Sequence, residues 1–277
     1  MPELPEVETV VRTLRKLVVG KKITSAKIIY PNLLKQPTNI NQFETEITGQ
    51  TINSIERIAK HIIFHFDNKV LISHLRMEGK WFYEEIGSQV NIKHQEAAFI
   101  IDDKMQLSYY DTRKFGTLHW QDVDNFRNSK PISTVGPEPF SELVTPNYLF
   151  NRINKSRKHI KTILLDQTII SGIGNIYADE ILFDAKINPL KSGNELKLDD
   201  FEQIITSSRK ILNKAVELGG TTIDSYQSAH GIDGKFQNYL KAHTRVGLPC
   251  LICGDTITKI KVNGRGTYYC QTCQVLE

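Results

Sequence analysis

The sequence predicts an α+β protein with more than one domain: a β-sandwich capped by an N-terminal helix, then a mainly helical domain that ends in a short hairpin. Three observations predict this organisation. Between residues 23 and 121, short alternating or β-branched runs are separated by polar breaks, which is typical of antiparallel strands. From residue 148 onward the apolar residues recur at helical spacing instead. All four cysteines lie between residues 250 and 273.

The first domain is expected to occupy residues 1–135. Apolar side chains recur at helical spacing from Val7 to Val19 and Gly20 ends the run, so a helix follows the N-terminus directly. The strands of a sandwich or flattened barrel come next. They are expected at Ile23–Tyr30, Thr51–Ile58, His61–Phe66, Val70–Leu75, Lys80–Glu84, Ala97–Ile101, Met105–Tyr110 and Thr117–Gln121. A linker of residues 136–146 ends the domain.

The second domain is expected over residues 147–240, with helices at Tyr148–Ile153, Ile160–Leu165, Ile176–Phe183 and Phe201–Leu218. Within it, two glycines and Asn175 open one of these helices. The free N–H groups at a helix start bind anions, although the same residues also suit a plain turn between two helices. The long polar loop from Gly219 onward is of a kind that is often functional, commonly as a lid.

The cysteines form two C-x2-C pairs, Cys250 with Cys253 and Cys270 with Cys273. Each pair puts two sulfurs on one tight knuckle, and two knuckles close a tetrahedral thiolate site, as structural zinc requires. Two disulfides are the alternative, but nothing else in the chain indicates an oxidising compartment. We therefore expect one structural zinc ion in a ribbon over residues 241–277. Arg265 lies between two glycines at the expected hairpin tip, where it could bind a nucleic acid or remain solvated.

The excess of positive charge lies in the C-terminal half. The chain carries 35 Lys and Arg against 31 Asp and Glu, and the two kinds cancel over residues 1–143. Beside a zinc ribbon a basic run favours a polyanion partner, although a solvated helix face is the plainer interpretation. No apolar run approaches the ~18 residues that span a bilayer, so a soluble, cytoplasmic protein is expected. The basic run of the C-terminal half contains Arg152, Lys155, Arg157, Lys158 and Lys161.

The N-terminus offers a candidate nucleophile. Met1 precedes the small residue Pro2, so we expect an aminopeptidase to remove it and leave a secondary amine. An α-amino group titrates near ~8 and can attack carbon, and a secondary amine then gives an iminium, which is an electron sink. Glu3, Glu6 and Glu8 could trade protons at such a site, or could only favour a helix start through its dipole.

Three more segments of the first domain could carry chemistry. Lys60 starts a strand and could face a groove, whereas a lone lysine is more often solvated. Met77 lies in a loop and is less obviously a core residue than most methionines. Arg113 and Phe115 share one turn. A ring there can wedge a base step and an arginine can fill the gap that an extruded base leaves, or the turn could simply tuck in its ring.

These segments contain recognisable motifs, in order over the whole chain. They are M-P-E-L-P-E-V-E-T at the start, S-H-L-R-M-E-G-K at 73–80, D-x-R-K-F-G at 111–116, G-P-E-P at 136–139, G-I-G-N-I-Y at 172–177, G-G-T-T at 219–222 and the final cysteine pairs. Together they resemble the bacterial formamidopyrimidine-DNA glycosylases. Endonuclease VIII looks similar at both ends but typically starts M-P-E-G-P-E, so Leu4 and the Arg113–Phe115 loop favour the purine-lesion branch.

The resemblance implies a helix-two-turn-helix motif in the helical domain and a function in DNA repair. The protein would be a bifunctional DNA glycosylase and abasic-site lyase. Its partner would be duplex DNA that contains 8-oxoguanine, formamidopyrimidines or abasic sites. It would flip out and excise the damaged base, then cleave the strand by β,δ-elimination through a Schiff base at Pro2. It would act as a monomer on bacterial DNA in the cytoplasm.

The resemblance also implies the catalytic residues. Pro2 would attack C1′ of the damaged nucleotide, and Glu3 would be its acid/base partner in ring opening and base release. Lys60 would serve the β-elimination and hold phosphate. Arg265 would assist the δ-elimination.

Further residues would hold the DNA. Met77, Arg113 and Phe115 would fill the void left by the flipped base, with Arg113 facing the orphan cytosine. The remaining DNA contacts would come from His94, Arg157, Lys161 and Asn175, and residues 219–240 would close over the flipped base. Relatives often show a His-x-His element where this chain has His94-Gln95-Glu96. A glutamate that faced DNA there would repel it.

Two other functions fit the same residues. One is a non-catalytic zinc-ribbon protein that binds DNA, which would follow if Met1 were retained, because the Pro2 nitrogen would then be an amide. The other is an oxidised-pyrimidine glycosylase of the endonuclease VIII type.

Overall fold

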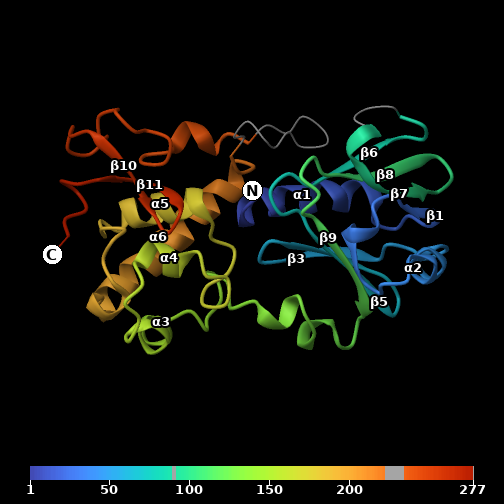
Figure 1. Ribbon diagram of the computed structural model, residues 1–277, viewed down its shortest axis with the longest axis horizontal. Helices are drawn as coiled ribbons and strands as arrows, with labels where there is room; N and C mark the ends of the chain where they lie inside the picture. The colour runs from blue at the N-terminus through green and yellow to red at the C-terminus, as the bar shows by residue number, and fades with distance from the viewer. Residues whose placement is uncertain (89–91, 222–233, 277) are drawn as a thin grey trace. The chain divides into compact units, whose positions relative to one another are not determined.

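The computed structural model describes residues 1–88, 92–221 and 234–276, which divide into two compact units (Figure 1). The first unit consists of Met1–Ser133 and Gly219–Gly234, and the second of Thr134–Leu218 and Lys235–Glu277. Residues Gly219–Gly234 therefore group with the first unit, although helices of the second unit precede them in the sequence.

The first unit begins with helix α1 (Leu4–Val18), whose N-cap residue is Glu3. Apolar side chains recur along it every three or four residues and so form one continuous face. Val7, Val11 and Val18 on that face are fully buried. The helix packs against strand β3 (Ser54–Ile58). The expected N-terminal helix is confirmed, and its packing anchors the N-terminus of the chain to the sandwich.

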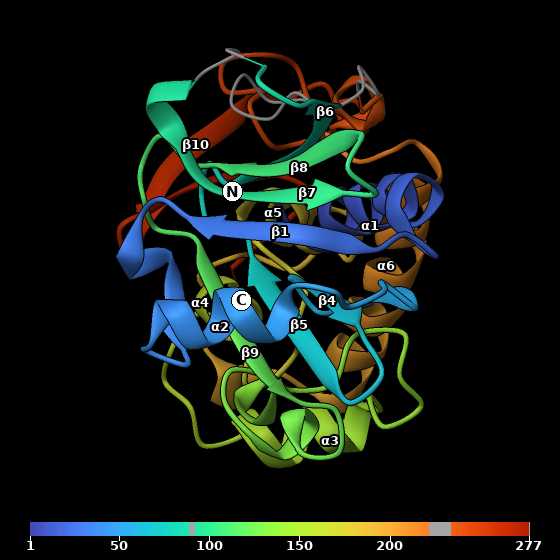
Figure 2. The same cartoon turned by 90° about the vertical axis from the view of Figure 1, so that its right-hand side faces the viewer.

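Two sheets make up the sandwich, with strand orders β1-β7-β8-β6 and β2-β9-β5-β4-β3. Figure 2 shows the strands of the first sheet one beneath another. Neighbouring strands pair antiparallel, except that β2 runs parallel to β9. The remaining strands are β1 (Ile23–Ile28), β2 (Leu34–Gln36), β4 (His61–His65), β5 (Lys69–His74), β6 (Lys80–Glu85), β7 (Gln95–Ile101), β8 (Met105–Tyr110) and β9 (Thr117–Asp122).

Sequence reasoning missed two elements of this unit, the helix α2 (Ile40–Ile47) and strand β2. Both are short, and β2 has too few residues for an alternation to be visible. Asn39 caps α2 by accepting a hydrogen bond from the N–H of Gln42 at 3.2 Å. The helix supplies Phe43 to the core, where its ring meets the Trp120 ring edge to face at 5.8 Å. Short 3₁₀ turns lie at Pro31–Leu33, Ile92–His94, Phe126–Asn128 and Ile132–Thr134.

The second unit is helical up to its last hairpin. It contains α3 (Pro146–Ile153), α4 (Ile160–Leu164), α5 (Asn175–Asp184) and α6 (Leu198–Glu217), with 3₁₀ turns at Gly193–Glu195 and Phe236–Tyr239. Both α3 and α5 pack against α6. Residues Tyr177–Phe183 of α5 are buried without interruption, so this helix is the centre of the unit.

A hairpin of β10 (Ile257–Val262) and β11 (Arg265–Cys270) ends the chain, and β11 packs on α5. The two-residue turn is Asn263-Gly264, with φ of 45° and 78°, the Asn-Gly sequence that such hairpin turns favour. Arg265 was expected at the tip of the hairpin. It is instead the first residue of β11, opposite Val262. None of the helices in the described part of the chain is long and apolar enough to cross a membrane.

Candidate active site

The two residues with the most direct catalytic assignment, Pro2 and Glu3, are both buried at the start of α1. Glu3 and Glu6 form a capping box, in which the N–H of Glu3 donates to Glu6 Oε2 at 2.9 Å. The box fixes the direction in which the chain enters the helix. It therefore holds Pro2 in a defined place rather than on a frayed end.

Glu6 has a second partner, which sequence reasoning did not foresee. Its Oε1 accepts hydrogen bonds from the N–H and the hydroxyl of Thr221, at 2.8 and 3.1 Å. Gly220 has φ of +78°, and a Cβ on it would lie 2.6 Å from the same Glu6 oxygen. The G-G-T-T motif is thus explained by a close approach of its backbone to the Glu6 carboxylate. The described end of the expected closing loop is tied to the helix that carries Pro2.

Lys60 is 4% exposed and lies in the two-residue turn between β3 and β4, where Ile58 pairs with His61. Arg57 binds this turn to α1: its Nη1 donates to the Ala59 carbonyl at 3.0 Å, and its Nε donates to Glu8 Oε2 at 3.0 Å. The structure therefore links the turn of Lys60 to the N-terminal half of the helix that begins beside Pro2. Glu8 therefore has a structural role, which accounts for one of the three acidic residues near the N-terminus.

Two histidines next to Lys60 are held neutral. The rings of His61 and His74 meet edge to face at 4.6 Å. Burial lowers the pKa of His61 to about 4, with smaller contributions from nearby positive groups, and burial lowers the pKa of His74 well below its usual value. His74 Nδ1 accepts a hydrogen bond from the N–H of Arg76 at 2.9 Å. A neutral imidazole thus positions the loop that carries Met77.

The Arg113–Phe115 loop is built on the buried carboxylate of Asp111. Its oxygens accept hydrogen bonds from the N–H groups of Arg113, Phe115 and Gly116 at 2.8, 3.0 and 2.8 Å. Phe115 is 52% exposed, and the guanidinium carbon of Arg113 lies 4.9 Å from the centre of its ring. A large exposed ring on a rigid base is not a tucked-in turn residue. The ring therefore stays a candidate for the predicted wedge.

The loops of Met77 and Phe115 meet the same side chain. A Cβ added at Gly79, or one added at Gly116, would clash with the hydroxyl of Tyr109. Tyr109 is fully buried in β8, so both loops pack closely against one fixed group. The structure therefore brings together two expected void-filling segments that are far apart in the sequence. The two glycines are the sequence signal for this close packing.

Glu96 does not face solvent. It is 1% exposed and lies where the β7–β8 register shifts, between Gln95 and Ala97. Burial, together with the nearby Asp111 carboxylate, raises its pKa to about 7. Neither carboxyl oxygen has a hydrogen-bond partner among the described residues. His94 is half-buried, and its carbonyl accepts the N–H of Asp111 at 3.0 Å.

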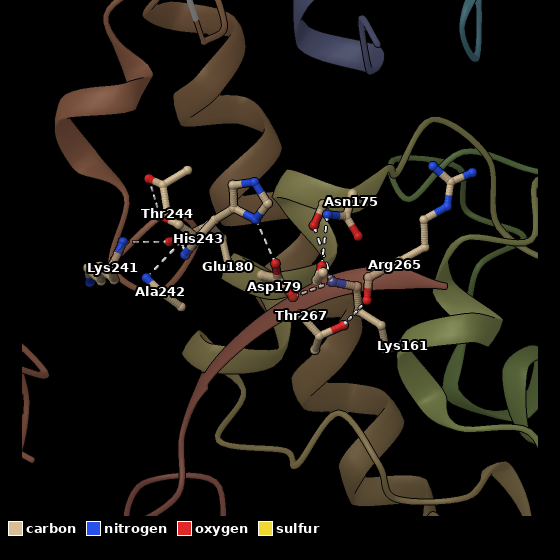
Figure 3. Close-up of polar contacts among 11 residues, drawn as sticks. Lys161, Asn175, Asp179, Glu180, Lys241, Ala242, His243, Thr244, Arg265 and Thr267 are labelled. Atoms are coloured by element: carbon tan, nitrogen blue, oxygen red, sulfur yellow. Dashed lines mark hydrogen bonds and ion pairs between the residues drawn. The ribbon is translucent and has the colours of Figure 1, made fainter. Parts of the chain in front are cut away.

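The expected DNA-binding residues of the second unit are not all exposed. Arg157 and Arg265 are exposed, and Asn175 is half-buried. Lys161 is 0% exposed, and its ammonium forms an ion pair with Asp179, which is also buried (Figure 3). The sequence interpretation of the basic run as one solvated face fails for Lys161, because this side chain points into the protein.

The four cysteines gather in one cluster, as their spacing predicted. Their sulfurs all lie within 4.8 Å of one another, and all four are free thiols. The N–H of Ile252 donates to Cys250 Sγ at 3.4 Å, a bond that stabilises a thiolate. Four convergent sulfurs on two knuckles match the donor set of structural zinc and leave no position for a substrate. Cys250, Cys253, Cys270 and Cys273 would hold the ion and fix the ends of the β10–β11 hairpin.

Comparison with known families and proteins agrees with this geometry. Three family models match in order: the formamidopyrimidine-DNA glycosylase N-terminal domain at residues 1–118, its H2TH domain at 135–227, and a zinc finger found in FPG and IleRS at 247–275. The expected fold class is thereby confirmed: an N-terminal β-sandwich, a helix-two-turn-helix domain and a C-terminal zinc finger.

Individual relatives are similar over their full length. The formamidopyrimidine-DNA glycosylase of Oceanobacillus iheyensis is 42% identical over 99% of this chain and 98% of its own. The Lactococcus lactis Fpg in complex with abasic-site DNA is 41% identical, with a TM-score of 0.91 over 99% of this chain and 100% of that one. A mutant of that protein with Fapy-dG DNA gives a TM-score of 0.93 at 41% identity and the same coverage. This chain therefore belongs to the formamidopyrimidine-DNA glycosylase family.

Proposed function

We propose that the protein excises formamidopyrimidines and oxidised purines from duplex DNA and then cleaves the abasic strand by β,δ-elimination. The observation that carries this proposal is the buried start of α1, where Pro2 directly precedes the capping box of Glu3 and Glu6. Full-length relatives named formamidopyrimidine-DNA glycosylase, and structures with abasic-site and Fapy-dG DNA, support it.

The chemistry begins at Pro2 once Met1 has been removed. The secondary amine attacks C1′, the N-glycosidic bond breaks with its electron pair going to the departing base, and ring opening gives an iminium. Glu3 transfers the protons of base release and ring opening. Loss of a C2′ proton then expels the 3′ phosphate, and loss of a C4′ proton expels the 5′ phosphate. In both eliminations the iminium takes up the electron pair of the broken C–H bond to give an enamine, and the enamine then expels the phosphate with the electron pair of the C–O bond. This is why the nucleophile is an amine.

Two cations serve these steps. Lys60, held by the Arg57 contacts in its turn, promotes the first elimination and binds phosphate. Arg265, exposed at the start of β11, assists the second. Its guanidinium can donate several hydrogen bonds to a departing phosphate. The zinc ion, when bound, has a structural role in keeping this hairpin folded.

Extrusion of the damaged nucleotide leaves a gap that the protein must fill. Phe115 wedges the base stack, Arg113 pairs with the orphan cytosine and Met77 occupies the remaining space, all three on loops that pack against Tyr109 or Asp111. His94, Arg157 and Asn175 contact the DNA backbone. Lys161 is buried, so we assign it an indirect role at the same part of the interface: it holds in place residues that contact the DNA. The closing role expected for residues 219–240 falls largely on residues 222–233, which lie outside the described part of the chain. The protein acts as a monomer on DNA in the bacterial cytoplasm.

Borohydride trapping tests this function. Purified protein is incubated with a duplex that contains one 8-oxoguanine opposite cytosine, reduced, and analysed on a denaturing gel. We expect a covalent adduct whose peptide map places it at Pro2, and a Glu3→Gln variant that traps a preformed abasic site but releases base at least ten times more slowly. A preparation shown by mass spectrometry to lack Met1 that binds the duplex and traps nothing would overturn the proposal.

Substrate comparison separates the alternative branch. The same assay with oxidised pyrimidines should give slower excision than with formamidopyrimidines. Faster excision of pyrimidine lesions would assign the protein to endonuclease VIII-type chemistry instead.

A further inference from the structure

Helix α5 carries two polar residues, one turn apart, on the side of the terminal hairpin. Asn175 and Asp179 are four positions apart and so lie on the same helix face. Asn175 Nδ2 donates to the carbonyl of Gly266 in β11 at 3.0 Å. Figure 3 shows Asn175 and Asp179 beside the strand that carries Arg265 and Thr267. Gly266 directly follows Arg265, so this contact fixes the backbone at the residue assigned to the second elimination.

Asp179 is a fully buried carboxylate with two different partners. Its Oδ1 is paired with the ammonium of Lys161, and its Oδ2 lies 2.6 Å from Nδ1 of His243. Its side chain is 0% exposed and that of His243 is 10% exposed. A buried charge of this kind persists only where its partners are well placed, so the geometry of all three side chains is mutually dependent.

Both partners of Asp179 also touch the hairpin. Lys161 Nζ lies 3.5 Å from the Gly266 carbonyl. The His243 ring meets the ring of Tyr268 edge to face at 4.8 Å. Thr267, between these two contacts, donates from its hydroxyl to the Arg265 carbonyl at 3.2 Å. The backbone from Arg265 to Tyr268 is thus contacted by Asn175, Lys161 and His243, and Asp179 joins the last two of these residues.

The backbone of His243 is held separately. The next residue of α5, Glu180, accepts hydrogen bonds from the N–H groups of Lys241, Ala242 and His243 at 2.9, 2.9 and 2.8 Å. This segment therefore stays on α5 even when the His243 ring is changed. The ring bond to Asp179 adds a link from the segment to the carboxylate, and hence to the hairpin.

We propose that Asp179 is a positioning residue for Arg265: through Lys161 and His243 it sets the place of β11 and so determines how far strand cleavage proceeds after the first elimination. The Arg265 side chain is exposed and points away from the Asp179 cluster in Figure 3, so Asp179 acts on it only through the backbone. The inference rests on the proposed function in that Arg265 assists the second elimination. Pro2, Glu3 and Lys60 belong to the other unit and keep their own contacts.

The test compares substitutions on the same helix. Asp179→Asn removes the charge that Lys161 and His243 share. His243→Phe keeps a ring against Tyr268 and removes only the bond to Asp179, which guards against an Asp179 variant that fails to fold. Asp184→Asn is the matched control, because Asp184 is also on α5 and also pairs with a lysine, Lys210, at 2.7 Å, but on the α6 side. Each variant is measured on a duplex with a preformed abasic site, with enzyme in excess.

We expect Asp179→Asn to lower the ratio of δ- to β-elimination product about tenfold and His243→Phe to lower it a few-fold, while the rate of borohydride trapping at Pro2 changes less than twofold. Asp179→Glu should restore part of the ratio. Amide hydrogen exchange should be faster over residues 265–270 in Asp179→Asn and unchanged in Asp184→Asn, with one zinc per chain in both.

The outcomes separate the two proposals. An unchanged product ratio in Asp179→Asn overturns the positioning role, and so does an equal fall in trapping and in δ-elimination, which would indicate general loss of DNA binding. If the parent protein itself traps no adduct, the proposed function fails. Amide hydrogen exchange over residues 265–270 then still decides whether Asp179 fixes the hairpin. Unchanged exchange in Asp179→Asn would overturn that claim.

Discussion

Glu6 and Thr221 are 215 positions apart in the sequence and are joined by two hydrogen bonds, both to Glu6 Oε1. One comes from the backbone N–H of Thr221 and the other from its hydroxyl. Because the other Glu6 oxygen accepts the N–H of Glu3, one carboxylate connects the residue after Pro2 with the described beginning of the closing loop. Thr221 is thereby fixed to the helix that begins beside Pro2.

Thr221→Val should slow base excision several-fold, because valine keeps the backbone N–H bond but loses the hydroxyl bond to Glu6. A single hydrogen bond to a charged group is worth about 1.5–3 kcal/mol, which sets an upper bound of about tenfold to about 150-fold on the change in rate. Single-turnover excision of 8-oxoguanine measures it. Thr221→Ser retains the hydroxyl and is the control. Equal rates for the two variants would show that the hydroxyl bond has no influence on excision.

Asp111→Asn should weaken discrimination of the base opposite the lesion. The amide keeps one acceptor oxygen, whereas the carboxylate accepts three N–H groups from the Arg113–Phe115 loop. We expect a loss of unfolding free energy of about 2 kcal/mol and a smaller ratio of excision opposite cytosine to excision opposite adenine. Urea unfolding and paired excision assays measure the two effects. A destabilised variant with an unchanged ratio would separate the loop from opposite-base recognition.

Glu96 should make the protein less stable as the pH rises from about 4.5 to about 7. Its pKa in the folded protein is raised from 4.5 to about 7, so the folded state binds the additional proton throughout that window and the unfolded state does not. Stability therefore falls until the folded group has ionised. Glu96→Gln cannot ionise, and it should gain unfolding free energy relative to the parent between pH 5 and pH 8, by at most about 3 kcal/mol.

Urea unfolding at pH 5 and pH 8 measures this difference. Glu85→Gln, a substitution of an exposed glutamate in β6, is the control and should show no pH-dependent gain. A constant difference between Glu96→Gln and the parent across the two pH values would mean that Glu96 ionises normally.

Zinc removal should abolish DNA binding and leave the sandwich folded. Cys250→Ser removes one of four ligands, and structural zinc sites of this type lose their fold with the metal. We expect loss of the zinc, loss of hydrogen-exchange protection over β10 and β11, and at least a hundredfold weaker binding of duplex DNA. Chelation of the parent protein followed by zinc addition should reverse the same changes. Retained metal with normal affinity would contradict the structural assignment.

The sequence predicted the parts of this protein that depend on local pattern. The alternation that marks the strands, the helical spacing of α1, α3, α5 and α6 and the spacing of the four cysteines each arise from neighbours along the chain. Short elements such as α2 and β2 left no such pattern. Arg265 was expected at the hairpin tip because a glycine lies on either side of it, but Asn263-Gly264 forms the turn and Arg265 is the first residue after it.

What the sequence by itself determined is the set of chemical groups: an amine at Pro2 with acids beside it, a thiolate site, and a ring and a guanidinium on one loop. Only the tertiary structure decided which groups are exposed and which meet. It buried Lys161 against Asp179, turned Glu96 into the core beside Asp111, and joined Glu6 to Thr221. Burial and long-range pairing depend on packing between distant segments. Whether a charged side chain contacts a partner at the surface or forms a buried ion pair therefore depends on its neighbours in space, which residue type and spacing do not specify.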